Sequence, residues 1–154
     1  MALLQYLDSK KVRYELTKHR PAFTAQQIAA EEHVPGMQVA KPVLIKADDK
    51  YYLCVLPACY KIVFSALSQY LRADDIRLAD EREMAEVFGG CQLGAEAPFG
   101  QLYGIETLMD EVLEKDVYIT FQAESHEQAV RIRMADYKKL VCPRILSFSY
   151  HERS

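Results

Sequence analysis

The sequence predicts an α+β domain built on a mixed, largely antiparallel sheet. Two observations indicate this fold class: strand-like segments cluster along the chain, and helical segments are inserted among them at several points. A length of 154 residues also fits one domain with one core. Because the chain shows no repeat, low-complexity tract or linker, we expect residues 1–154 to form a single domain.

The first segments are expected to be a helix that runs into a strand. Residues 2–11 carry leucines at helical spacing, and residues 12–16 alternate apolar and polar side chains as a half-buried strand does. The sequence Thr24-Ala25-Gln26-Gln27 has the form of a capping box. It predicts a short helix to about Glu32, which Pro35-Gly36 ends.

A β-hairpin is expected next, because residues 38–46 and 51–57 are apolar and the acidic pair at 48–49 suits a turn. Pro42 lies inside the first of these strands and has no backbone N–H to donate. The strand is therefore expected either to be an edge or to be broken beside Lys41.

The second half of the chain alternates between the two kinds of element. Residues 60–71 have helical spacing, and Asp80-Glu81-Arg82-Glu83 is a second capping box, for a helix to about Phe88 that Gly89-Gly90 ends. Residues 91–104 contain four breakers and predict a long loop. Strands are then expected at 105–109, 117–121, 130–134 and 145–148, with helical stretches near 111–115 and 135–141.

Composition argues against several classes of protein. Charged residues interrupt the chain so often that no apolar run reaches the roughly 18 to 20 residues that a membrane span requires. The N-terminus has neither a basic region before its leucines nor a small-residue cleavage site, so it does not read as a secretory signal. We therefore expect a cytoplasmic protein that does not associate with membranes.

Cysteine and histidine are too scattered to suggest a disulfide framework or a metal site. The chain contains Cys54, Cys59, Cys91 and Cys142, and His19, His33, His126 and His151. No Cys-x-x-Cys pair and no pair of histidines at i, i+4 occurs. No cysteine has the neighbouring base that would activate it as a nucleophile, and Gly-x-Ser-x-Gly is absent. We expect no metal ion and no cofactor.

Two short segments contain residue types that could bind an anionic, carbonyl-bearing group. Val39-Ala40-Lys41 places a lysine among apolar strand residues, where its ammonium group either reaches the surface or meets a specific anion. The segment Gly94-Ala95-Glu96-Ala97-Pro98-Phe99-Gly100 opens with a glycine, which allows backbone N–H groups a close approach to a ligand. Phe99 could form an apolar wall or simply fill the core.

Taken with the chain length, these segments resemble the YbaK-like family, the free-standing aminoacyl-tRNA deacylases related to the editing domain of bacterial prolyl-tRNA synthetases. The resemblance runs from about Leu4 to about Phe148. It implies a curved, barrel-like sheet with helices packed around it. It also implies an enzyme that hydrolyses the ester bond of mischarged aminoacyl-tRNA carrying a small amino acid, with the tRNA 3′ acceptor end as its main partner and a synthetase as a possible one.

The resemblance also implies a set of site residues. Lys41 corresponds to the lysine of a Val-x-Lys-Thr-like motif, which meets the 3′-terminal phosphate or the esterified carbonyl; Pro42 stands where that motif often has Thr or Ala. The Gly94-x-x-x-Pro98 loop would direct its backbone N–H groups towards the aminoacyl carbonyl and position the attacking water. His126 lines the pocket or transfers a proton, and His19 shapes its rim. Ala40, Phe99, Gly100 and Ser125 complete the expected substrate contacts.

The net charge of −3 argues against extensive contact with a polyanion. The last quarter of the chain is nevertheless basic, with Arg131, Arg133, Lys138, Lys139 and Arg144. This cluster could hold the terminal nucleotides of a tRNA or could be a solvated face.

Three functions remain open: the deacylase, a non-catalytic module that binds aminoacyl-nucleotide or a synthetase through the same pocket, and a general small-molecule esterase. Alanine, serine, threonine, proline and cysteine are all plausible as the edited amino acid.

Overall fold

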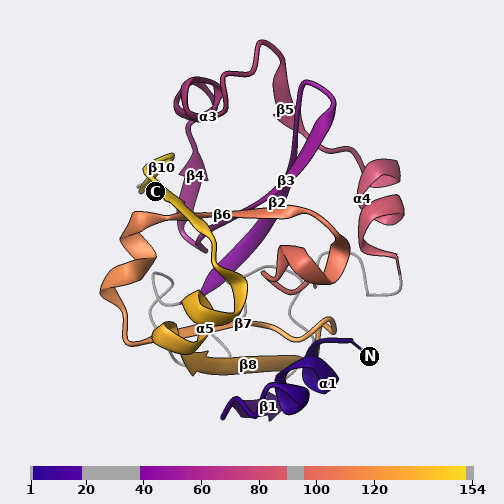
Figure 1. Cartoon of the computed structure of the whole chain (residues 1–154), viewed down its shortest axis with the longest axis vertical. Coiled ribbons are helices and arrows are strands. Elements are labelled where there is room, and N and C mark those ends of the chain that lie inside the picture. The colour runs from indigo at the N-terminus through magenta and orange to yellow at the C-terminus, as the bar shows by residue number, and fades with distance from the viewer. Residues whose placement is uncertain (1, 19–38, 90–95, 152–154) are drawn as a thin grey trace.

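The computed structural model describes residues 2–18, 39–89 and 96–151, which form an α+β arrangement (Figure 1). The helices are α1 (Ala2–Ser9), α3 (Phe64–Leu71), α4 (Glu81–Phe88) and α5 (Met134–Val141), with the 3-10 helices η2 (Gly100–Tyr103) and η3 (Glu111–Lys115). The strands are β1 (Glu15–Lys18), β2 (Ala40–Ala47), β3 (Lys50–Pro57), β4 (Tyr60–Ile62), β5 (Ile76–Leu78), β6 (Glu106–Asp110), β7 (Tyr118–Gln122), β8 (Gln128–Arg133), β9 (Arg144–Leu146) and β10 (Ser149–His151).

The described strands form three sheets, and most of their pairings are antiparallel. The largest sheet has the order β5-β2-β3-β6-β9, and it is mixed because β6 runs parallel to both β3 and β9. The other two sheets, with the strand orders β1-β8-β7 and β10-β4, are entirely antiparallel. An isolated parallel bridge between Val39 and Thr120 connects the start of β2 to β7. The predicted fold class, a mixed and largely antiparallel α+β domain, is confirmed.

The predicted hairpin is the centre of the large sheet. Strands β2 and β3 pair along their whole lengths, with Lys41 opposite Leu56, and Asp48 has a positive φ of 52° at the turn. Pro42 does not break β2. On its other side β2 pairs with β5 only from Ile45 to Ala47, so at Pro42 the strand has the β3 partner alone. Neither alternative holds for the strand as a whole: β2 is continuous and lies between β5 and β3, and it is unpaired with β5 only around Pro42, where a proline is tolerated.

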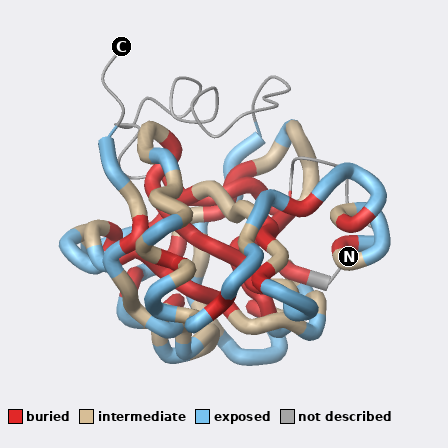
Figure 2. Tube along the Cα trace, turned by 90° about the horizontal axis from the view of Figure 1, so that it is seen from above, coloured by how far each residue is buried: buried red, intermediate tan, exposed pale blue. Residues whose placement is uncertain are grey.

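The buried side chains lie mainly in two clusters, and Figure 2 shows the buried positions gathered inside the molecule. In the first, Leu3 and Leu7 of α1 pack with Phe99, Phe121 and Tyr137. The second, around Leu56, Leu67, Leu108 and Phe148, lies between α3 and the large sheet. Helices α1 and α5 thus cover the three-stranded sheet, and α3 belongs to the other half of the core. No helix among the described residues is long and apolar enough to span a membrane.

Several sequence expectations need correction. Residues 60–71 are not one helix: β4 precedes α3, because residues 60–62 pair with β10 at the far end of the chain. The first strand begins at Glu15, and all four of its residues are exposed, so it is not half-buried. Short strands at 76–78 and 149–151 were not expected. The helix predicted after Thr24 lies outside the described residues.

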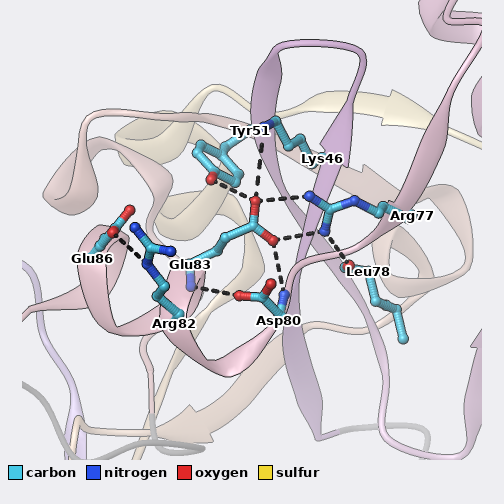
Figure 3. A network of polar contacts seen from close by, with 8 residues as sticks. All are labelled: Lys46, Tyr51, Arg77, Leu78, Asp80, Arg82, Glu83 and Glu86. Atoms are coloured by element: carbon cyan, nitrogen blue, oxygen red, sulfur yellow. Dashed lines mark hydrogen bonds and ion pairs between the residues drawn. The ribbon is translucent and has the colours of Figure 1, made fainter.

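Helix α4 begins at the predicted capping box and is fixed to the large sheet by Glu83 (Figure 3). The Asp80 carboxylate accepts from the Glu83 N–H at 2.8 Å, and the Glu83 carboxylate accepts from the Asp80 N–H at 3.0 Å. Glu83 also accepts from both terminal nitrogens of Arg77, at 2.7 and 2.9 Å, and from the Tyr51 hydroxyl at 2.8 Å. Lys46 lies 3.8 Å away.

Because of these contacts, we expect Glu83 to make the stability of the fold depend on pH in the acidic range. The hydrogen bonds from Arg77 lower the pKa of Glu83 most, followed by those from the Asp80 N–H and the Tyr51 hydroxyl. A carboxylate whose pKa falls on folding contributes its full stabilisation above its unfolded pKa of about 4.3, and that contribution is lost progressively as the pH falls from there through the lower pKa of the folded state. We expect Glu83→Gln to lower the urea midpoint at pH 7, and we expect the difference from wild type to shrink steadily as the pH is lowered below about 4.

The matched control is Glu86→Gln, one turn along α4, where an exposed carboxylate makes an i, i+4 pair with Arg82 at 3.4 Å. Exposed pairs of this kind contribute little, so its midpoint should stay near wild type at both pH values. Equal midpoint losses for the two variants at pH 7 would contradict the anchoring role of Glu83.

Candidate functional site

Lys41 is the second residue of β2 and is half-buried. Before it, Val39 and Ala40 are buried, and the Val39 carbonyl accepts from the Ala58 N–H at 2.8 Å. Together with the Val39–Thr120 bridge, this bond fixes the start of β2 between the end of β3 and β7. The chain is therefore held on both sides two residues before Lys41, and Lys41 itself pairs with Leu56 of β3, which suits a side chain that must present its charge at a fixed point.

The charge of Lys41 reaches the thiol of Cys59, which is half-buried just after β3. Burial raises the pKa of the Cys59 thiol, and a backbone hydrogen bond and the Lys41 charge only partly offset that rise. Burial likewise raises the pKa of Cys54 in β3. Both thiols thus favour the neutral form, and neither has the character of an activated nucleophile.

The loop that contains Pro98 and Gly100 is held by hydrogen bonds along its backbone. The Tyr137 hydroxyl donates to the Pro98 carbonyl at 2.5 Å, and the Gly100 N–H donates to Oγ1 of Thr107 at 2.9 Å. A Cβ at Gly100 would collide with that Thr107 oxygen and would lie 2.5 Å from the Ile105 carbonyl oxygen. Glycine is required here by close packing against β6.

Phe99 lies in the core, with no exposed surface. Its ring makes edge contacts with Tyr6, Phe121 and Tyr137, at centroid distances of 6.3, 5.4 and 5.3 Å. The ring therefore packs three parts of the chain together, which is the core-filling alternative. A contact between Phe99 and substrate stays a prediction.

Ser125 and His126 lie in the turn between β7 and β8, and both are half-buried. The Ser125 hydroxyl accepts from the Glu127 N–H at 3.1 Å, which closes the turn. The preceding residue, Glu124, has a positive φ of 61°. This left-handed backbone conformation changes the direction of the chain after β7, and the Glu124 side chain lies near the loop that contains Pro98.

Glu124 joins this turn to the Pro98 loop, and sequence reasoning did not find it. Its carboxylate accepts from the Tyr103 hydroxyl at 3.1 Å and from the Leu3 N–H at 3.1 Å. The same Tyr103 hydroxyl oxygen accepts from the Ala97 N–H at 3.1 Å. The turn with Ser125 and His126 is thus linked through Glu124 and Tyr103 to the residue beside Pro98. A glutamate in a polar turn carries no sequence signal for this role.

The predicted site residues that the structure describes lie in two parts of the fold. One is the loop of Pro98, Phe99 and Gly100 with the turn of Ser125 and His126, and the other is the strand start at Ala40 and Lys41. Ala40 belongs to the same buried cluster as Ala97 and Phe99, which connects the two parts through the core. Gly94 and His19 lie outside the described residues.

Three of the five basic residues in the last quarter of the chain are engaged by acidic partners. Arg131 pairs with Glu15 at 2.9 Å, Lys138 with Glu114 at 2.8 Å, and Arg144 with Glu106 at 2.7 Å. The cluster read from the sequence is therefore not one continuous basic patch. Arg133 and Lys139 form none of these pairs and line a groove against α1.

Comparison with known proteins identifies what the chain is similar to. The family model described as aminoacyl-tRNA editing domain matches residues 19–140. Over 110 residues, 71% of this chain, the sequence is 28% identical to a proline–tRNA ligase of Halalkalibacterium halodurans. The match spans only 19% of that relative, so the chain corresponds to a small part of it.

Two solved structures share the fold along nearly the whole chain. Hypothetical protein APE2540 gives a TM-score of 0.87 at 15% identity, covering 96% of this chain and 99% of its own. A protein described as a candidate trans-editing enzyme for prolyl tRNA synthetase gives a TM-score of 0.83 at 14% identity, covering 96% and 94%. At these identities the likeness shows the fold.

Proposed function

The chain belongs to the aminoacyl-tRNA editing domain family, and from that membership we propose that it hydrolyses the ester bond of mischarged aminoacyl-tRNA carrying a small amino acid. The products are the free amino acid and the tRNA. We further propose that it acts as a single domain in the cytoplasm, on the 3′ acceptor end, and alongside a prolyl-tRNA synthetase. The match to a segment of a proline–tRNA ligase supports that last part.

The observation that carries the proposal is the position of Lys41. Lys41 is a half-buried residue that follows the buried Val39 and Ala40, and the chain is held on both sides at Val39. In a partly desolvated site, a fixed positive charge stabilises an anion more than it does in water. Lys41 would therefore stabilise the oxyanion that forms when water attacks the ester carbonyl, or would hold the terminal phosphate beside it.

The remaining groups orient the substrate. The Gly94–Pro98 loop would supply N–H donors to the carbonyl, while Ser125, His126 and His19 would line the space for a small side chain. An aminoacyl ester is already activated, and the free hydroxyl of the terminal ribose can help to place the water. The protein then needs to supply mainly orientation and charge, which agrees with the neutral state favoured by Cys54 and Cys59.

A second candidate is a non-catalytic module that binds the aminoacylated end without cleaving it. Pro42 favours this alternative, because it removes one backbone N–H directly after Lys41. With one donor fewer, the site would bind an anion less well in the transition state.

A deacylation screen tests the proposal. Transfer RNAs charged with alanine, serine, threonine, proline or cysteine are incubated with the protein, and the remaining ester is measured over time against buffer. We expect at least one of these esters to be lost well above its spontaneous rate. Loss at the spontaneous rate for all five would favour the binding module.

A further inference from the structure

A groove of about 770 Å³ runs between the end of α1 and the start of α5. Five cationic side chains and one carboxylate line it: Lys10, Lys11, Arg13, Arg133 and Lys139, with Asp136. Its cations come from two parts of the sequence that are more than 100 residues apart. The fold therefore assembles a basic surface that neither segment suggests alone.

The five groove cations differ from several other basic residues, which are engaged by carboxylates. Arg77, Arg131, Lys138 and Arg144 each lie within 3 Å of a carboxylate oxygen. Within the described parts of the chain, none of the five groove cations forms a salt bridge. The formal net charge of the whole chain is −3, whereas the groove lining has five cations against one carboxylate.

The groove is also connected to the loop of the proposed site. The side-chain amide of Gln101, directly after Gly100, donates to the Tyr6 hydroxyl and to the Leu140 carbonyl, both at 3.3 Å. Tyr6 and Leu140 line the groove. The Tyr6 ring also contacts Phe99, and the Lys10 ammonium lies 5.7 Å from its centre. One wall of the groove is thus built on the residues that follow Pro98.

We propose that this groove binds the sugar-phosphate backbone of RNA, next to the site that receives the aminoacylated end. The inference rests on the proposed function and extends it by giving the acceptor stem a docking surface. Five cationic side chains along one groove suit a chain of phosphates, and such contacts fix position without reading sequence. Binding through phosphates also releases counterions, which makes affinity fall steeply with salt.

The test compares two double variants that each remove one lysine and one arginine. Arg13→Gln with Lys139→Gln changes the groove. Arg72→Gln with Lys115→Gln is the matched control, because both residues are exposed, lie outside the groove and form no salt bridge within the described parts of the chain. Binding of uncharged tRNA is measured by fluorescence anisotropy between about 50 and 200 mM salt, where the phosphate contribution changes strongly.

We expect the groove variant to bind roughly ten- to a hundredfold more weakly at low salt, and its slope of log affinity against log salt to fall by about 2, one for each lost contact. The control should keep the wild-type slope. A groove variant with wild-type affinity and slope would overturn the proposal and would leave the surface to another partner, such as a protein.

A second readout separates this inference from the proposed function. The groove variant should hydrolyse an aminoacylated CCA trinucleotide at the wild-type rate, because that substrate has no stem to occupy the groove. Equal losses on the trinucleotide and on full tRNA would contradict the groove role. If wild type hydrolyses neither substrate, the proposed function fails, and the tRNA binding curves still decide the question of the groove.

Discussion

Replacing Lys41 by alanine is expected to lower kcat/KM for aminoacyl-ester hydrolysis by about 10²- to 10³-fold, the typical loss when one positioned electrostatic contact is removed. Lys41 is half-buried at a strand start that hydrogen bonding holds in place. The fold should survive, because the removed group is a partly exposed side chain on a continuous strand. Single-turnover hydrolysis of alanyl- and seryl-tRNA measures the effect, with circular dichroism to confirm folding.

Two further variants make this test specific. Lys50→Ala removes an exposed lysine at the turn that begins β3 and should leave the rate near wild type. Lys41→Arg keeps the charge and should retain more activity than Lys41→Ala, although guanidinium geometry differs. His126→Ala should cost less than Lys41→Ala, since we assign His126 a lining role. Full activity in a folded Lys41→Ala protein would remove the lysine from the mechanism.

The largest expected loss of stability follows from replacing Phe99 by alanine. The ring has no exposed surface and contacts Tyr6, Phe121 and Tyr137. Removing a buried phenyl ring typically costs about 3 to 5 kcal/mol, through lost burial and the cavity left behind. We expect the free energy of unfolding in urea to fall by that amount, with α1 and α5 both losing a packing partner.

Tyr70→Ala is the control, because this aromatic side chain on α3 is 47% exposed. It should change the free energy of unfolding by no more than about 0.5 kcal/mol. A comparably small change for Phe99→Ala would mean that its ring is not part of the core. Retained stability together with a raised KM would instead favour the prediction that Phe99 is a wall of the substrate pocket.

Local signals predicted the parts of the fold that depend on neighbouring residues. The hairpin of β2 and β3 follows from two apolar runs around an acidic turn, and the capping box before α4 follows from Asp80 and Glu83. The strand β4 was missed because its pairing partner is β10, almost ninety residues away. Three residues with no turn signal of their own cannot reveal such a partner.

The candidate site divides in the same way. Lys41 was predicted because a lysine among apolar strand residues is unusual and because its segment resembles the lysine motif of the family, and its role stays a prediction. The tie from Glu124 to Tyr103, and the groove that joins Lys11 to Lys139, depend on how distant segments pack. Conversely, the basic run near the C-terminus looked like one surface in the sequence. In the structure Arg131, Lys138 and Arg144 pair with carboxylates of other elements.

The most direct test of the central claim is a single-turnover time course with enzyme in excess over alanyl-tRNA and seryl-tRNA. The wild-type protein, Lys41→Ala and buffer are compared under identical conditions. Ester cleavage by wild type well above the buffer rate, with most of that gain lost in folded Lys41→Ala, is the expected result. Wild-type cleavage at the buffer rate on both substrates, despite measurable tRNA binding, would contradict the deacylase and leave a binding module.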